Sequence, residues 1–316
     1  MNQTTPPTAA SMPEGHLNAL LTAVESKTVI ITGGANGIGA ATAKLFHAHG
    51  ANVVAADLES SRGAAEALIE SLGQPSRASF LPASVVDWAQ MTAVFKETLR
   101  QFGRIDIVVA NAGIMETQPV LDMEDLNADG ELRESLEASR VIDVNLKGTL
   151  NTLRLAMFYM KESPPDSPRS IVLLASTSGY FGGTGVSAYI ASKHGVVGLL
   201  RASQSAAKRY GIRVNGVAPF FTPTHITAGF AESWKAAGLE ANTVDGVARV
   251  IARAAMDPTN EGVCLLTAGK HVRDLESTRM QLLPSWLGSD TAEFMGRAMR
   301  FFTEIGGYVL PKARTG

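Results

Sequence analysis

Short runs of apolar residues alternate along the chain with stretches in which apolar positions recur at helical spacing. The runs are rich in Val, Ile and Leu, without alternating polar residues, as is typical of parallel strands covered on both faces. Strands are expected at 28–32, 52–56, 79–82, 105–110, 170–175, 213–218 and 262–267. Helices are expected at 38–49, 61–72, 87–102, 188–210 and 244–255, and a further long one ends near Glu162. The pattern predicts an α/β fold, a single doubly wound Rossmann-type domain whose seven-stranded, mostly parallel sheet carries helices on both faces.

The two ends of the chain depart from this alternation. Residues 1–26 are rich in Thr, Pro and Ala, and they contain neither the apolar core of a signal peptide nor an Arg. We expect them to form a mostly disordered leader, followed by the Rossmann-type domain at residues 27–270. Residues 271–316 continue past the last strand, with Phe294 and Phe301 at helical spacing. This C-terminal extension is expected to pack on the domain or on an oligomer partner.

Composition excludes several classes of protein. The 316 residues are 45% hydrophobic and carry a net charge of −2, without the basic stripe that binds nucleic acid. The single cysteine, Cys264, has apolar neighbours and is expected to be a buried thiol in a reducing, cytoplasmic compartment. No run reaches the roughly 18 apolar residues that a membrane span needs. The histidines lack the spacing of metal ligands, so no metal is expected.

A glycine-rich segment follows the first predicted strand and opens a helix. Gly33, Gly37 and Gly39 allow a tight turn and a close approach of backbone N–H groups to a phosphate. The helix N-terminus adds a partial positive charge. The spacing is G-x-x-x-G-x-G, not the general G-x-G-x-x-G fingerprint, and a glycine-rich turn without a ligand is the alternative reading.

An acidic residue supports a dinucleotide at this loop. Asp57 lies at the end of the second predicted strand, where a carboxylate can accept both hydroxyls of an adenosine ribose and repel a 2′-phosphate. Asn36 stands in the loop where an Arg or Lys would welcome that phosphate. Both residues favour NAD over NADP. Arg62, which is near in sequence, weakens this preference, and the alternative for Asp57 is a solvated acid in a loop.

A second motif supplies groups that move a proton. Tyr189 and Lys193 are four residues apart and share one face of a predicted helix. A nearby ammonium and a positive nicotinamide ring are expected to lower the pKa of the phenol, which could then take the proton of a substrate hydroxyl. Ser176, at the end of the fifth strand, is expected to bind the substrate oxygen, and Lys193 to donate to the nicotinamide ribose. Tyr-x-x-x-Lys alone is a weak pattern, but its small neighbours indicate tight packing.

Together these motifs resemble the short-chain dehydrogenases/reductases over residues 27–270. Gly33, Gly37 and Gly39 match the family's cofactor loop, and Ser176, Tyr189 and Lys193 match its catalytic residues. Further matches are Asn111-Ala112-Gly113, with Ala110 in place of the family's first Asn, and the strand Arg213-Val214-Asn215-Gly216-Val217-Ala218-Pro219. The resemblance implies that Asn145 steadies a water in a proton relay behind the lysine. It also implies a homodimer or homotetramer built through the two long helices around Asn145 and Tyr189.

The chain departs from the family pattern at two places besides its long C-terminal extension. Ser84-Val85 stands where the family often has Asp-Val beside the adenine ring. Phe220-Phe221 follows Pro219 where the family usually has Gly, and either Thr222 or Thr224 could meet the nicotinamide carboxamide. The expected catalytic residues are Asn145, Ser176, Tyr189 and Lys193. The expected cofactor-binding residues are Gly33, Asn36, Gly37, Ile38, Gly39, Asp57, Ser84, Val85, Asn111, Ala112, Gly113, Tyr189, Lys193, Pro219, Thr222 and Thr224.

The residues expected near the substrate are aromatic and apolar. They are Met115, Tyr180, Phe181, Gly182, Gly183, Phe220 and Phe221, with more bulk expected from residues 224–234. We expect NAD-dependent oxidation of a lipophilic secondary alcohol, such as a terpenoid, steroid-like or polyketide hydroxyl, in specialised metabolism. Two alternatives stay open: an NADPH-dependent carbonyl reductase on the same fold, and a non-catalytic NAD-binding sensor.

Overall fold

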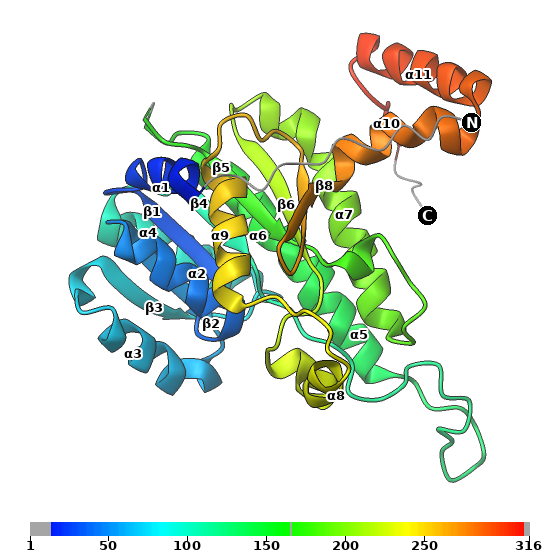
Figure 1. Cartoon of the computed structure of the whole chain (residues 1–316), viewed down its shortest axis with the longest axis horizontal. Coiled ribbons are helices and arrows are strands. Elements are labelled where there is room, and N and C mark those ends of the chain that lie inside the picture. The colour runs from blue at the N-terminus through cyan, green and yellow to red at the C-terminus, as the bar shows by residue number, and fades with distance from the viewer. Residues whose placement is uncertain (1–13, 165, 313–316) are drawn as a thin grey trace. The chain divides into compact units, whose positions relative to one another are not determined.

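The computed structural model describes residues 14–164 and 166–312 of the chain. These residues form one eight-stranded sheet in the order β3-β2-β1-β4-β5-β6-β7-β8 (Figure 1). The strands are β1 (Thr28–Thr32), β2 (Asn52–Asp57), β3 (Ala78–Pro82), β4 (Ile107–Ala110), β5 (Ser170–Leu174), β6 (Arg213–Pro219), β7 (Cys264–Ala268) and β8 (His271–Asp274). Strands β1 to β7 pair in parallel, which confirms the predicted doubly wound sheet. The predicted count of seven strands was one too low, because β8 pairs antiparallel with β7.

Helices cover both faces of the sheet (Figure 1). One face carries α1 (Glu14–Thr22), α2 (Gly37–Ala48), α3 (Arg62–Ser71) and α9 (Val244–Met256). The other carries α4 (Trp88–Phe102), α6 (Gly148–Met160) and α7 (Ser187–Lys208), with α5 (Leu136–Ile142) packed on α7. A π-helical segment, Asp143–Lys147, joins α5 to α6. Short 3-10 turns lie at Glu59–Ser61, Pro75–Arg77, Thr177–Gly179 and His225–Phe230, and the last leads into α8 (Ala231–Ala236).

Two apolar layers hold the helices to the sheet. Val29 and Ile31 of β1 face α2, whose Phe46 is fully buried among them. Ile30 of β1 points to the opposite face, as successive strand residues must. On that face Phe95 and Met160 are fully buried on α4 and α6. With both faces covered, the strands read as unbroken apolar runs, which is why they could be located from the sequence.

The N-terminal segment is not disordered throughout, contrary to the sequence prediction. Residues 14–22 form α1, which packs on α9, and its Leu17 and Leu21 are buried together with Val24. These three apolar residues recur at helical spacing and cover the end of the core. The predicted leader therefore contributes to the domain from residue 14 onward, and residues 1–13 lie outside the described residues.

The described residues divide into two compact units, residues 14–274 and residues 275–312. The first extends past the predicted boundary at residue 270 because β8 completes the sheet. The second contains α10 (Leu275–Leu287) and α11 (Ser289–Glu304), which contact each other, and the predicted helical repeat of Phe294 and Phe301 lies in α11. None of the helices in the part of the chain described here is long and apolar enough to cross a membrane.

Candidate active site

The carboxyl ends of the parallel strands bring the predicted cofactor residues together. The strand order reverses between β1 and β4, and in doubly wound sheets the ligand crevice lies beyond such a switch point. Strand β1 ends at Thr32 and runs into the glycine loop, residues 33–39. Strand β4 ends at Ala110 and is followed by Asn111, while β6 ends at the predicted cofactor residue Pro219.

Glycines shape the loop after β1 because no side chain fits there. Gly33 and Gly37 have φ angles of 63° and 52°, in the left-handed region that favours glycine. A Cβ atom on Gly33 would lie 2.9 Å from Ala112 Cα, and one on Gly39 would lie 2.0 Å from the Gly33 carbonyl oxygen. The loop therefore packs directly on the backbone that follows β4.

Asn111 ties the two strand ends together. Its Nδ2 donates to the main-chain oxygens of Thr32 at 2.9 Å and Gly33 at 3.0 Å. The Thr32 hydroxyl accepts from the backbone N–H groups of Asn111 at 3.0 Å and Ala112 at 3.2 Å. The Asn111 side chain thus fixes the shape of the glycine loop, and Asn111 and Ala112 line its edge.

The start of α2 fits an anionic group. The N-cap residue Asn36 makes no side-chain hydrogen bond to the first turn. The backbone N–H groups of Gly37, Ile38 and Gly39 therefore have no capping side chain, and the helix end carries a partial positive charge. This combination suits the pyrophosphate of a dinucleotide.

Asp57 is the last residue of β2 and lies beside the glycine loop. Its Oδ2 accepts from the backbone N–H of Ala35 at 3.1 Å, and its Oδ1 accepts from Leu58 N–H at 2.8 Å. Arg62, the residue that complicated the NAD prediction, is engaged elsewhere: its Nη2 donates to Glu59 Oε2 at 2.9 Å. A carboxylate, not a guanidinium, therefore adjoins the loop at the end of β2.

The segment after β3 is held against α4 and α6. Ser84 N–H donates to Gln90 Oε1 at 2.8 Å, and Val85 O accepts from Asn151 Nδ2 at 3.0 Å. The Val85 side chain fills the space beside Gly148, where an added Cβ would lie 2.5 Å from Val85 Cγ2. Main-chain bonds and packing thus fix the position of this segment, which the resemblance assigned to the adenine ring.

The two threonines after β6 have different surroundings. Thr222 is buried, its hydroxyl donates to Phe220 O at 3.1 Å, and it accepts from Asn242 Nδ2 at 3.1 Å. Thr224 lies beside the glycine loop, since its Cγ2 is 3.6 Å from the position of a Cβ on Gly37. Of the two, Thr224 is the one next to the loop.

Asn145, Ser176, Tyr189 and Lys193, hereafter the tetrad, come from three segments. Tyr189 and Lys193 lie one turn apart on α7, and Ser176 is the N-cap of the 3-10 turn after β5, accepting from Ser178 N–H at 3.1 Å. Ser176 lies close enough to Tyr189 to lower the pKa of its phenol. Lys193 Nζ lies 5.6 Å from the centroid of the Tyr189 ring. The structure therefore brings the predicted serine, tyrosine and lysine together.

In the protein by itself the pKa of Tyr189 lies above its ordinary value, and the predicted lowering by Lys193 together with a bound nicotinamide ring stays a prediction. Burial raises the pKa of Tyr189, and the nearby Ser176 opposes this rise without cancelling it. Lys193 Nζ donates to Leu174 O at 2.8 Å and lies over the phenol ring. Burial also lowers the pKa of Lys193 to about 8. Desolvation disfavours the charged forms of both groups.

Asn145 is fully buried in the π-helical segment and links two parts of the site. Its Oδ1 accepts from Ile114 N–H at 2.8 Å, and its Nδ2 donates to Ile114 O at 2.8 Å and to Ser192 Oγ at 2.9 Å. A Cβ on Gly113 would lie 3.2 Å from Asn145 Oδ1 and 3.5 Å from Lys193 Nζ. Gly113 therefore leaves space between an amide oxygen and an ammonium.

Sequence reasoning missed two polar residues that support this site. Ser192 Oγ donates to Tyr189 O at 2.7 Å while it accepts from Asn145, and its place inside Tyr-x-x-x-Lys was an available signal. Asn242 holds Thr222 and also donates to Thr267 O at 3.0 Å, joining the ends of β6 and β7. No local pattern marked Asn242, because its partners are distant in sequence. A third missed residue, the buried Glu116, accepts hydrogen bonds from the first turn of α7.

Part of the apolar surround predicted for the substrate forms an aromatic cluster. Phe221 packs on Phe230 and Trp234, with ring centroids 5.1 and 4.5 Å apart, and Phe220 packs on Trp234 at 5.4 Å. Phe221 is buried, whereas Phe220 and Phe230 are exposed. The segment from the 3-10 turn to α8 thus packs on the end of β6 through aromatic side chains.

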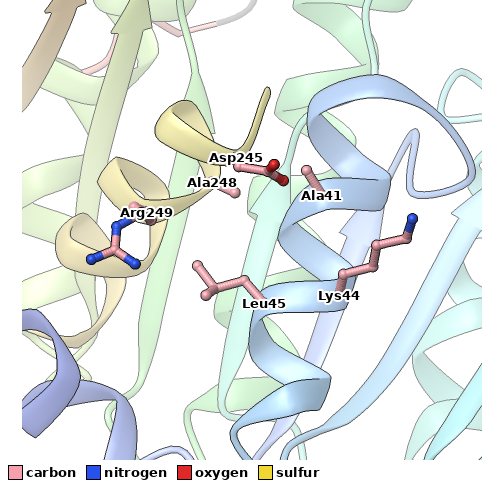
Figure 2. Close-up of a pocket in the computed structure, with 6 residues that line it drawn as sticks. All are labelled: Ala41, Lys44, Leu45, Asp245, Ala248 and Arg249. Atoms are coloured by element: carbon pink, nitrogen blue, oxygen red, sulfur yellow. The ribbon is translucent and has the colours of Figure 1, made fainter. Parts of the chain in front are cut away.

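Two surface pockets lie apart from the tetrad. The smaller, of ≈ 260 Å³, lies between α2 and α9 (Figure 2). Figure 2 shows Leu45 and Ala248 at the gap between the helices, with Lys44 pointing away from it. The larger, of ≈ 480 Å³, is lined by residues of the loop between β4 and α5 and by the first two residues of α5. No tetrad residue lines either pocket.

The fold and the glycine loop define a dinucleotide-binding α/β protein, with a tyrosine, a lysine and a serine beside the ligand crevice. Residues 27–234 match the family described as short chain dehydrogenase. The chain belongs to this family of oxidoreductases, which uses nicotinamide cofactors.

Relatives and solved structures agree with this assignment. The chain is 34% identical over 284 residues to short-chain dehydrogenase/reductase prx4 of Penicillium roqueforti, covering 84% of this chain and 81% of the relative. It is 36% identical over 206 residues to (+)-borneol dehydrogenase 1 of Salvia officinalis, covering 65% of this chain and 74% of the relative. A Brucella melitensis structure titled short-chain dehydrogenase/reductase SDR:Glucose/ribitol dehydrogenase aligns with a TM-score of 0.66 and 28% identity, covering 78% of this chain and 96% of that one.

Proposed function

We propose that this enzyme oxidises a lipophilic secondary alcohol to a ketone in a reversible reaction, with NAD as its cofactor. The observation that carries the proposal is the placement of Tyr189 beside both Ser176, which lowers the pKa of the phenol, and the buried Lys193, whose Nζ lies over the phenol ring. This arrangement presents a donor and a proton acceptor to one oxygen atom. NAD, when bound, accepts the hydride that leaves the carbinol carbon.

Each tetrad residue has a proposed role. Ser176 donates a hydrogen bond to the substrate oxygen, and Tyr189 takes the hydroxyl proton as general base. Lys193 supplies positive charge that favours the phenolate, and it donates to the nicotinamide ribose. Asn145 positions Ile114 and Ser192, and it holds a water in the proton relay behind Lys193. Because burial raises the pKa of Tyr189 in the protein alone, the phenol needs the further positive charge of the bound oxidised cofactor near neutral pH.

Asp57 is proposed to select NAD over NADP. Its carboxylate lies at the end of β2 beside the glycine loop, where it accepts from Ala35 N–H. Such a group accepts ribose hydroxyls and repels a 2′-phosphate. We further propose that Thr224, which lies beside Gly37, is the threonine that contacts the cofactor, while Thr222 supports the strand end.

The proposed substrate is apolar because the aromatic cluster of Phe220, Phe221, Phe230 and Trp234 lies at the end of β6. The similarity to a protein named (+)-borneol dehydrogenase 1 supports an alcohol of this kind. An NADPH-dependent carbonyl reductase is the alternative on the same fold.

We also propose a homodimer or homotetramer through α6 and α7, since α7 exposes the small residues Ala191, Gly198 and Ala202. The fully buried Cys264 is compatible with a reducing, cytoplasmic compartment.

A test follows from the role of Tyr189. A panel of lipophilic secondary alcohols is assayed with NAD and with NADP by the absorbance of the reduced nicotinamide. We expect turnover with NAD, and a loss of about three orders of magnitude in kcat for Tyr189→Phe. Tyr210→Phe is the matched control, because Tyr210 is an exposed tyrosine that follows α7. Normal turnover by Tyr189→Phe would remove the proposed base, and a preference for NADPH and ketones would support the alternative.

A further inference from the structure

Helix α7, which carries Tyr189 and Lys193, lacks a capping side chain of its own. Its N-cap residue is Val186, which makes no side-chain hydrogen bond. The backbone N–H groups of the first turn of a helix have no intrahelical partner, so an acceptor is needed when that turn is buried. Ala188, in this first turn, is buried. The acceptor therefore has to come from elsewhere in the chain.

Glu116, in the loop after β4, supplies it. Its Oε1 accepts from Ala188 N–H at 3.0 Å, and its Oε2 accepts from Tyr189 N–H at 3.0 Å. These are the second and third residues of α7, the positions that a local cap would serve. Glu116 is 7% exposed, so its charge is screened little by solvent. One carboxylate thus binds the main chain of the proposed base with negligible competition from water.

We propose that Glu116 is a positioning residue for the reaction: it fixes the main chain of Tyr189 and, through its negative charge, sets the pH at which the phenol becomes a base. This inference rests on the proposed function. The two effects oppose each other, since the bonds place the phenol and the charge disfavours the phenolate. A negative charge at a helix N-terminus also offsets the positive end of the helix dipole, which would otherwise make the phenol more acidic.

The electrostatic part of the proposal has support beyond the two hydrogen bonds. After burial, the charge of Glu116 is the other influence that raises the pKa of Tyr189, while Ser176 lowers it. The other charged groups on segments packed against the start of α7 do not bind its first-turn N–H groups as Glu116 does. Lys193 lies over the ring, and Glu137 of α5 is bound to Thr117 and Gln118.

The remaining charged residues on these segments are Arg140 of α5 and, in the π-helical segment, Asp143 and Lys147, and all three are exposed. Water screens exposed charges strongly. Glu116 is therefore the acidic group with the most direct influence on Tyr189.

Two substitutions separate the effects of charge and position. Glu116→Gln keeps the size of the side chain, removes the charge and leaves one oxygen to accept from one of the two N–H groups. We expect the acid limb of the pH profile of kcat/KM to move down by on the order of one pH unit. Glu116→Asp keeps the charge but is too short to hold both N–H groups. We expect the limb to stay in place while kcat falls roughly 10- to 100-fold.

Glu137→Gln is the matched control. Glu137 also accepts from two backbone N–H groups, those of Thr117 at 2.9 Å and Gln118 at 3.1 Å, but it does not contact α7 through them. The control therefore loses comparable bonds in the same loop without changing the charge at Tyr189. We expect its pH profile to match that of the wild type.

A second readout needs neither substrate nor turnover. Alkaline titration of tyrosine absorbance, taken as wild type minus Tyr189→Phe, reports the ionisation of this phenol with and without NAD. The same subtraction in the Glu116→Gln background should show the phenol ionising at lower pH. If the titration moves while the alcohol panel shows no activity, the proposed function fails and the role of Glu116 stands. If Glu116→Gln leaves both the titration and the pH profile at the wild-type position, or shifts them no more than Glu137→Gln does, Glu116 is only a structural cap and the proposal is overturned.

Discussion

At the scale of the residue, the buried Lys193 lowers the free energy of unfolding. The side chain is 4% exposed, and burial lowers its pKa from 10.5 to about 8. A folded-state pKa below the unfolded value means that the charged form is disfavoured in the fold. The cost is complete below pH 8, shrinks as the pH rises from 8 to 10.5, and is absent above that range. It amounts to roughly 3 kcal/mol at neutral pH.

Replacing this lysine should therefore stabilise the protein while it abolishes activity. Lys193→Met removes the buried charge but loses the bond to Leu174 O, which is worth about 1 kcal/mol. We expect the free energy of unfolding to rise by about 2 kcal/mol at pH 7, and this gain to disappear as the pH approaches about 10. Urea denaturation at the two pH values measures it.

The control for this change is Lys44→Met, because Lys44 is exposed on α2. Its effect on the free energy of unfolding should be small and the same at both pH values. A destabilised Lys193→Met variant at pH 7 would show that the bond to Leu174 outweighs the burial of the charge.

At the scale of the element, α1 has a stabilising role that its sequence did not reveal. Leu21 is fully buried and belongs to the core cluster that α9 shares with the sheet. Leu21→Ala should lower the free energy of unfolding by about 2–4 kcal/mol, because it leaves a cavity in that cluster. Asn18→Ala, an exposed change on the same helix, should have little effect. Equal stability of the two variants would mean that α1 does not dock on the domain in solution.

The elements that sequence predicted well are those with long apolar runs. The seven parallel strands and the helices between them were located, because full burial on both faces leaves an unbroken pattern. Strand β8 was missed because His271-Val272-Arg273-Asp274 is short and polar, and it lies at the edge of the sheet. Helix α1 was missed because its composition resembles that of the preceding residues, and only its packing on α9 makes the helix useful.

The site was predictable where the chemistry requires a residue type at a fixed spacing. Examples are Gly33 and Gly37 in the glycine loop, and Tyr189 and Lys193 on α7. The structure places the two glycines in one turn and the other two side chains one helical turn apart. Glu116 was not found because it acts on α7 from a distant loop. A hint existed in Val186, an N-cap residue without an acceptor, but the sequence could not show which carboxylate replaced it. The raised pKa of Tyr189 in the protein alone could not be predicted, because desolvation depends on the packed structure.

At the scale of the whole molecule, residues 275–312 raise the question of what their apolar side chains contact. Helix α11 has no buried residue, and Trp286, Phe294 and Met299 are 72%, 63% and 63% exposed. A helical hairpin of this size has too little core to be stable alone. The two predicted arrangements, packing on the domain or on an oligomer partner, differ in what removal of the hairpin would do.

Truncation after Asp274 tests both arrangements. The truncated chain keeps β8, and every residue proposed to bind the cofactor precedes the cut. We therefore expect it to unfold cooperatively and to gain thermal stability on addition of NAD, as the full chain should. Light scattering then gives the mass in solution. If the hairpin packs on a partner, the mass should fall to that of an assembly with fewer copies, while the thermal midpoint of the domain stays the same. If it packs on its own domain, the number of copies in the assembly should stay the same, while the thermal midpoint falls. Loss of cooperative unfolding or of the response to NAD would contradict the division at Asp274, because it would make residues 275–316 part of the folding unit that binds the dinucleotide.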